Sequence, residues 1–209
     1  MDIIKLKRHS SQELLDRLRR VPLLKQPEIQ VYAEALISLE RLHTDHLAPT
    51  QNYIWFAEFR KVQELRWSLA EQGVDLFHLD GFVTFTVRRA DGTEEDYDVY
   101  PPVVEESIEA DGRLALVIND GMHRLYLARL EWVVPQVIYV RGVPPEYPYY
   151  AFPRPGGWEG IDLLPDNPDP KTYLKKCHRR RDNKRLYRDF QAVFANVGRS
   201  RSQLLNSGK

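Results

Sequence analysis

The sequence predicts one α+β domain in which a small mixed β-sheet is flanked by helices from both ends of the chain. Three observations support this class: helix-like apolar spacing in the first third, β-branched runs with hairpin turns in the middle, and a helix-prone basic region at the end. With 209 residues and 43% hydrophobic content, the chain can bury one sizeable core. We therefore divide the single domain 1–209 into a helical part at 1–75, a sheet core at 80–142, and a Pro- and aromatic-rich loop with basic helices at 143–209.

Three helices are expected in the first part. A capping-box pattern begins at Ser10, and Pro22 ends the helix that follows. Apolar residues at helical spacing predict a second helix over 27–43 and a third over 53–72, with Gly73 as the residue after its end.

The middle of the chain changes to a β pattern. Asp-Gly pairs at 91–92 and 111–112 are hairpin-turn signals, and a helix over 122–132 is expected to connect the last two strands. The strands are expected at 82–89, in the polar run ending at 97–100, and at 103–107, 114–119 and 135–140.

The last part combines a long loop with a basic segment. Residues 143–170 are rich in Pro, Gly and aromatic side chains, and helices are expected at 170–178 and 183–196, followed by ten frayed residues. From Lys171 to Lys209 there are twelve Lys or Arg residues against two acids, whereas the whole chain has 30 of each sign. The charge of the whole chain therefore gives no hint of nucleic-acid binding, but this segment is dense enough in cations for several phosphate contacts.

Several classes of protein are excluded by composition. No apolar run approaches the roughly 20 residues that span a bilayer, and the N-terminus lacks the apolar stretch of a signal peptide. The single cysteine, Cys177, cannot form an internal disulfide. We therefore expect a cytoplasmic protein that has no contact with membranes.

The most informative feature is the junction at Asp120 and Gly121, where an apolar β run ends and a helical pattern begins at once. His123 and Arg124 fall in the first helical turn, although a helix N-terminus carries a partial positive charge and prefers acids there. Free amides together with a His and an Arg make a good receptor for an anion. The junction therefore predicts a phosphate site.

The stretch from 100 to 140 resembles the ParB/sulfiredoxin superfamily. The residues that carry the resemblance are Pro101-Pro102-Val103, the Asp111-Gly112 turn, Asp120-Gly121-Met122-His123-Arg124, Ala128 in the following helix and Pro135 before the last strand. In this superfamily the strand-to-helix junction binds nucleotide phosphates. Its members include chromosome-partition proteins that hydrolyse CTP, sulfiredoxins that use ATP, and free-serine kinases. The resemblance implies that Gly121, Met122, His123 and Arg124 bind a nucleotide or a phosphorylated small molecule.

The cofactors implied are ATP, ADP or CTP with Mg²⁺, and the implied chemistry is phosphoryl transfer or nucleotide hydrolysis. Asp120 and His123 are the candidate catalytic residues, and Asp120 is also the candidate Mg²⁺ ligand. Sulfiredoxin chemistry is not expected, because Met122 stands where that branch has its cysteine and a thioether cannot act as the nucleophile. Further candidates for a general base are Glu28, Glu105 and Glu106.

Three alternatives remain open. The junction could be a plain strand-to-helix turn, with Asp120 capping the helix and Arg124 in solvent. The protein could instead be a non-enzymatic DNA- or RNA-binding protein, or the basic segment could close over the anion site of the same chain. The cations proposed for nucleic-acid binding are Lys175, Lys176, Arg179, Arg180, Arg181 and Arg185.

Overall fold

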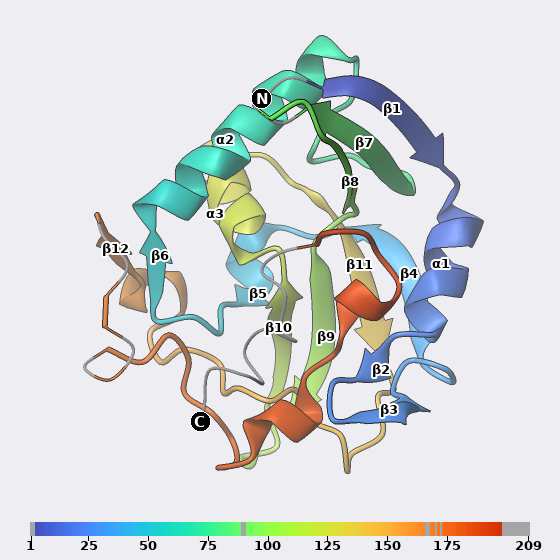
Figure 1. Cartoon of the computed structure of the whole chain (residues 1–209). Helices are drawn as coiled ribbons and strands as arrows, with labels where there is room; N and C mark the ends of the chain where they lie inside the picture. The colour runs from blue at the N-terminus through green and yellow to red at the C-terminus, as the bar shows by residue number, and fades with distance from the viewer. Residues whose placement is uncertain (1–2, 89–90, 166–167, 170, 172, 198–209) are drawn as a thin grey trace.

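The computed structural model describes residues 3–88, 91–165, 168–169, 171 and 173–197. In this part of the chain, mixed and antiparallel sheets combine with three α-helices, which confirms the α+β class (Figure 1). The described residues contain no helix that is long and apolar enough to cross a membrane.

A five-stranded mixed sheet forms the centre of the molecule, in the order β4-β11-β9-β10-β5. Its β9–β10 and β11–β4 pairs are antiparallel, whereas β11 runs parallel to β9 and β5 parallel to β10. The strands are β4 (Leu36–Arg41), β5 (Leu47–Ala48), β9 (Val103–Ile108), β10 (Leu114–Asp120) and β11 (Gln136–Arg141). All three strands predicted over 103–140 are present.

Helix α3 (Met122–Leu130) makes the crossover from β10 to β11 and packs on one face of the sheet beside α2 (Phe56–Glu71). Leu125 and Ala128 of α3 join Phe59 of α2 in a core that also contains buried residues of β9, β10 and β11. Neighbouring β9 residues point into different cores, Val103 into one and Val104 into the other. The sheet is therefore buried on both faces, which explains its nearly continuous apolar runs.

The opposite face is covered by α1 (Ser11–Arg19) and by segments from both ends of the chain. The predicted capping box is present, because the Ser10 side chain accepts from the Glu13 amide while the Glu13 side chain accepts from the Ser10 amide. A smaller antiparallel sheet, in the order β1-β7-β8, lies next to this layer. Its strands are β1 (Ile3–His9), β7 (Phe82–Arg88) and β8 (Glu94–Val99). Two further pairs are β2 (Pro22–Leu23) with β3 (Gln26–Gln30), and β6 (Tyr53–Trp55) with β12 (Asp162–Leu164).

The helix expected over 27–43 is wrong. Residues 26–41 form β3, a turn and β4, and β4 pairs with β11 over six residues, from Leu36 opposite Arg141 to Arg41 opposite Gln136. Ile37 and Leu39 pack on the core two residues apart, as strand side chains do. Their spacing to neighbouring apolar residues also fits a helix, so only the hydrogen-bonding partner β11 decides between the two.

The two C-terminal helices are also wrong where the structure describes them. Residues 173–197 contain only the short 3₁₀ turns η3 (Asn183–Leu186) and η4 (Phe190–Ala192). The backbone between them bonds to β2 instead of to itself: Leu24 N donates to Tyr187 O, and Asp189 N donates to Pro22 O. The ten frayed residues predicted at the end lie outside the described residues.

A buried ion pair fixes this C-terminal segment on the sheet. The Arg188 side chain is fully buried, and its guanidinium donates to both carboxylate oxygens of Glu105 on β9, at 3.0 and 3.1 Å. Burial acts to lower the pKa of Arg188, but Glu105 and Tyr32 together outweigh it and the pKa is raised, so the guanidinium stays charged. Carbonyl oxygens of Tyr147, Pro148 and Leu186 accept its other N–H groups.

We expect Arg188→Met to lower the free energy of unfolding by about 3–5 kcal/mol, because Glu105 is then left buried without its cation. Urea denaturation followed by circular dichroism measures this. The control is Arg180→Met, which removes an exposed cation from the same segment and should change stability by less than about 0.5 kcal/mol. Equal effects of the two variants would show that the ion pair does not hold the segment.

Candidate functional site

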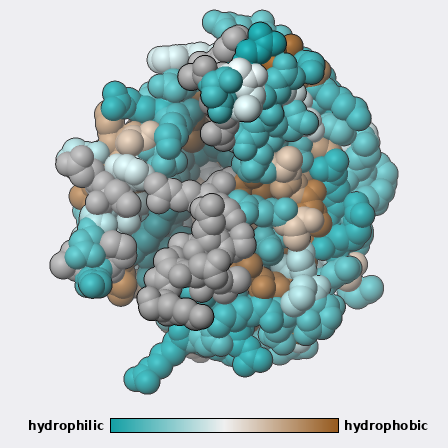
Figure 2. All heavy atoms as spheres, viewed as in Figure 1, coloured by the Kyte–Doolittle hydropathy of each residue, from teal (hydrophilic) through white to brown (hydrophobic). Residues whose placement is uncertain are grey.

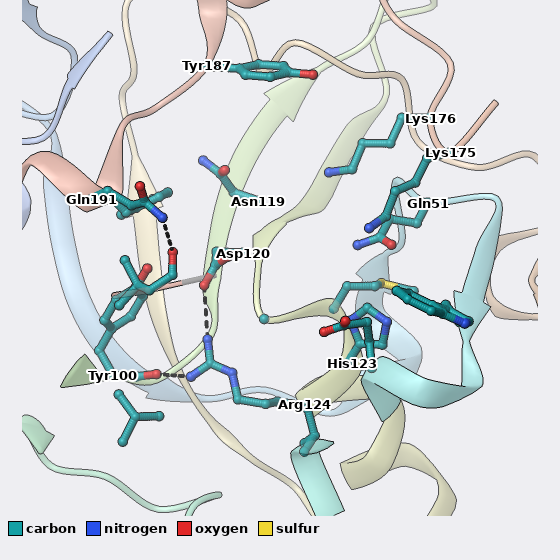
Figure 3. A pocket seen from close by; sticks show the side chains of 18 of the residues that line it. Gln51, Tyr100, Asn119, Asp120, His123, Arg124, Lys175, Lys176, Tyr187 and Gln191 are labelled. Carbon is teal, nitrogen blue, oxygen red and sulfur yellow. Dashed lines mark hydrogen bonds and ion pairs between the residues drawn. The ribbon is translucent and has the colours of Figure 1, made fainter. Parts of the chain in front are cut away.

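The start of α3 opens into a cleft of about 800 Å³. Its walls come from the end of β10, from β6 and α2, from β7 and β8, and from the C-terminal segment at 174–197. In Figure 3, Asn119, Asp120 and Arg124 lie on one side of the cleft, and Gln51, Lys175 and Lys176 lie on the other. Segments far apart in the sequence therefore meet at the junction that the sequence singled out.

Gly121 has the conformation that the junction requires. Its φ is 83°, in the left-handed region, and a Cβ there would lie 2.7 Å from Cβ of Pro102. Both the backbone angle and the close approach of Pro102 exclude a side chain at this position. Gly121 is the N-cap of α3 and supplies no capping side chain, so the capping role considered for Asp120 is wrong.

Arg124 turns back to the strand end instead of facing solvent. Its guanidinium donates to Asp120 Oδ2 at 3.0 Å and to the Tyr100 carbonyl oxygen, and its side chain is 12% exposed. The idea that Arg124 lies free in solvent is therefore wrong. The Asp120–Arg124 pair ties the first turn of α3 to the end of β10, so the cation placed against the helix dipole has a neutralising partner.

His123 is a neutral side chain in the wall of the cleft. Burial and then the positive charge of Lys175 lower the pKa of His123 from 6.5 to about 4, against smaller opposite effects of Glu58 and Asp120. Its Nε2 atom is buried and has no hydrogen-bond partner. At neutral pH His123 can therefore exchange a hydrogen bond with a ligand, but it does not supply positive charge.

The structure divides the predicted nucleic-acid cations into two groups. Lys176 is buried and donates to the Tyr149 hydroxyl at 2.6 Å, and Arg179 is paired with Glu109 at 2.5 Å. Exposed cations remain at Lys175, Arg180, Arg181 and Arg185. Of the six, Lys175 and Lys176 line the cleft.

The three acids proposed as alternative bases do not line the cleft. Glu105 is paired with Arg188, Glu106 accepts a hydrogen bond from Tyr139, and Glu28 is exposed on β3. The acids that do line it are Asp98, Asp120 and Glu58 of α2, and Glu58 acts to raise the pKa of His123. The sequence carries no signal for Glu58, because an acid in the first turn of a helix is ordinary.

Sequence reasoning also missed two amide side chains in the cleft. Gln51 and Asn119 are 8% and 3% exposed, and their amide oxygens have no hydrogen-bond partner. Only the polar end of the apolar run 114–118 could have drawn attention to Asn119. The described residues contain no cluster of three or more His, Cys, Asp or Glu side chains that could hold a metal ion.

The sequence model of the ParB CE domain matches residues 13–162, which is well over half of the chain. The chain belongs to this family. The match contains the whole junction and the stretch 100–140, so the predicted relationship to ParB-like domains is confirmed. No curated protein and no solved structure matches the chain.

The requirement for glycine at position 121 of this ParB CE domain can be tested by comparison with Gly112, which also has a left-handed backbone. Gly112 has φ 80° and open space around its Cβ position, so Gly112→Ala carries only the backbone strain of about 1–2 kcal/mol. Gly121→Ala adds the clash with Pro102, and we expect about 1–3 kcal/mol of further destabilisation in chemical denaturation. Equal losses for the two variants would mean that Pro102 gives way without cost.

The pH dependence of stability should report the half-buried, neutral His123. Its pKa is about 4 when folded and about 6.5 when unfolded, so between these values the unfolded chain binds more protons. The resulting contribution is fully present above pH 6.5 and is lost as the pH falls toward 4, by up to roughly 3 kcal/mol.

Denaturation of the wild type and of His123→Asn at several pH values measures this contribution. The difference in unfolding free energy between them should change across this range and stay constant above it. Parallel curves throughout would contradict the burial of a neutral imidazole.

Proposed function

We propose that this ParB CE domain binds the phosphate groups of a nucleotide or a phosphorylated small molecule in the cleft at the start of α3. The observation that carries the proposal is the meeting of two sources of positive potential in one cavity, namely the first turn of α3 and Lys175. The first four amides of a helix have no partner within the helix, and they attract anions. This arrangement also fits the alternative in which the basic segment closes over the anion site.

The structure changes the roles proposed for the junction residues. Lys175 takes the role of phosphate-binding cation that the sequence suggested for Arg124, because Asp120 and the Tyr100 carbonyl oxygen hold the Arg124 guanidinium. The backbone N–H of Asn52 donates to the Lys175 carbonyl oxygen at 2.8 Å, which fixes the backbone of the lysine beside the cleft. His123 contributes a hydrogen bond and Gly121 allows close approach of the backbone.

ATP, ADP or CTP with Mg²⁺ remain the proposed cofactors. Mg²⁺ binds one or two carboxylates together with phosphate oxygens, and Asp120 fits this role because Arg124 occupies only its Oδ2 atom. The bound ion would neutralise phosphate charge. If the protein is an enzyme, phosphoryl transfer or nucleotide hydrolysis suits such a site, since that chemistry depends on positioning and electrostatics. Asp120, His123 and Glu58 are the residues to test for a catalytic role.

Lys175→Met should weaken nucleotide binding by at least tenfold, because a charge-assisted contact to phosphate is worth about 1.5–3 kcal/mol. Isothermal titration with ATP, ADP and CTP, each with Mg²⁺, measures the affinities. Arg180→Met is the matched control, since it removes an exposed cation that does not line the cleft. If none of the three nucleotides binds the wild type, or if both variants lose affinity equally, the proposed site is wrong.

A second candidate function is DNA or RNA binding by the exposed cations Arg180, Arg181 and Arg185. Figure 2 shows one face of the molecule, which is mostly hydrophilic. Affinity for duplex DNA that falls steeply with salt, and that decreases in the Arg180 variant but not in the Lys175 variant, would favour this function over nucleotide binding.

A further inference from the structure

Three buried polar atoms without hydrogen-bond partners belong to residues that line the cleft. They are Gln51 Oε1, Asn119 Oδ1 and His123 Nε2, contributed by the loop before β6, the end of β10 and the first turn of α3. Buried polar atoms in folded proteins are nearly always hydrogen-bonded, and each unmade bond costs about 1–3 kcal/mol. Their occurrence together in a cavity indicates groups that a ligand satisfies.

The orientation of the Asn119 amide is set by a chain of buried hydrogen bonds. Tyr32 donates its hydroxyl proton to Glu105 at 2.9 Å, and burial together with Glu105 keeps the pKa of Tyr32 well above its ordinary value. The same hydroxyl can then only accept from Asn119, and it does so from Nδ2 at 2.7 Å. This leaves Oδ1 as the free end of the Asn119 side chain, so the residue presents an acceptor.

The backbone also holds both amides in place. The pairing of β10 with β9 shifts register between Ile118 and Asp120, so Asn119 lies at an irregularity that re-aims its side chain. The Thr50 hydroxyl donates to the Ile118 carbonyl at 3.0 Å and ties the residue before Gln51 to the same strand. Figure 3 shows Asn119 and Gln51 on opposite sides of the cleft, with His123 below them.

We propose that the amide oxygens of Gln51 and Asn119 accept hydrogen bonds from hydroxyl or amino groups of the ligand whose phosphate lies at the start of α3. This rests on the proposed function and adds the class of ligand: a phosphate ester that carries hydrogen-bond donors, as opposed to inorganic phosphate. Carbonyl-type oxygens next to a phosphate site would repel a bare anion, whereas they bind sugar hydroxyls or the amino group of a base. A site with such acceptors rejects analogues that lack the donors.

The test compares phosphate monoesters of equal charge by calorimetry. Methyl phosphate has no donor group, ribose 5-phosphate has sugar hydroxyls, cytidine 5′-monophosphate adds an amino group, and its 2′,3′-dideoxy form keeps the amino group without those hydroxyls. We expect the wild type to bind at least one donor-bearing ester tenfold or more tightly than methyl phosphate. Tight binding of ribose 5-phosphate would show that the sugar provides the donors, and tight binding of the dideoxy form would show that the base does.

Variants of the cleft test whether the two amides cause the preference for donor-bearing esters. Gln51→Met keeps the length of the side chain and removes its acceptor, and it should weaken binding of the preferred ester about tenfold more than binding of methyl phosphate. Tyr32→Phe should also reduce it, because Tyr32 positions Asn119 without lining the cleft. The control Gln12→Met changes an exposed glutamine on α1 and should have no effect.

The possible failures can be told apart. Equal affinity of the wild type for all four esters would overturn this inference and leave the phosphate site standing. An unchanged preference in both Gln51→Met and Tyr32→Phe would also overturn it. If no ester binds, the proposed function and this inference fail together.

Discussion

The ion pair between Arg188 and Glu105 is the constraint on which the arrangement of this molecule depends. Two opposite charges are buried between the central sheet and the C-terminal segment, and every polar contact of the guanidinium is made inside the protein. Such a pair contributes little net stability compared with apolar packing, but it is costly to break. Its main effect is therefore specificity: it gives the C-terminal segment, which has no regular helix, a single position on the sheet.

The Arg188–Glu105 ion pair also affects the cleft. Lys175 and Lys176 of the same C-terminal segment line the cleft opposite Asp120 and Arg124, and the backbone N–H of Asn52 holds the Lys175 carbonyl oxygen. The carboxylate of Glu105 also orders Tyr32, which in turn orients Asn119. The buried charge pair thus supports the acceptor that we assign to ligand recognition.

At the strand-to-helix junction, the structure gives Arg124 a different role from the one that the sequence predicts. Arg124 stands where a helix disfavours positive charge, and the structure pairs it with Asp120 so that it stabilises the turn. The positive potential available to a ligand then comes from the helix amides and from Lys175. His123 stays neutral because it is buried beside that lysine.

The sequence by itself determined the α+β class, the ParB-like relationship, the strands and helix from 103 to 132, and the glycine that the junction needs. The class, the elements and the glycine follow from local signals, namely apolar periodicity and turn residues, whereas the relationship rests on the motif residues between 100 and 140. Only the tertiary structure decided that 27–43 forms strands and that the basic segment is not helical, because β11 and β2 supply hydrogen-bond partners that lie far away in the sequence. It also decided which cations are buried and which amides face the cleft, since burial and amide orientation are properties of neighbours brought together by folding.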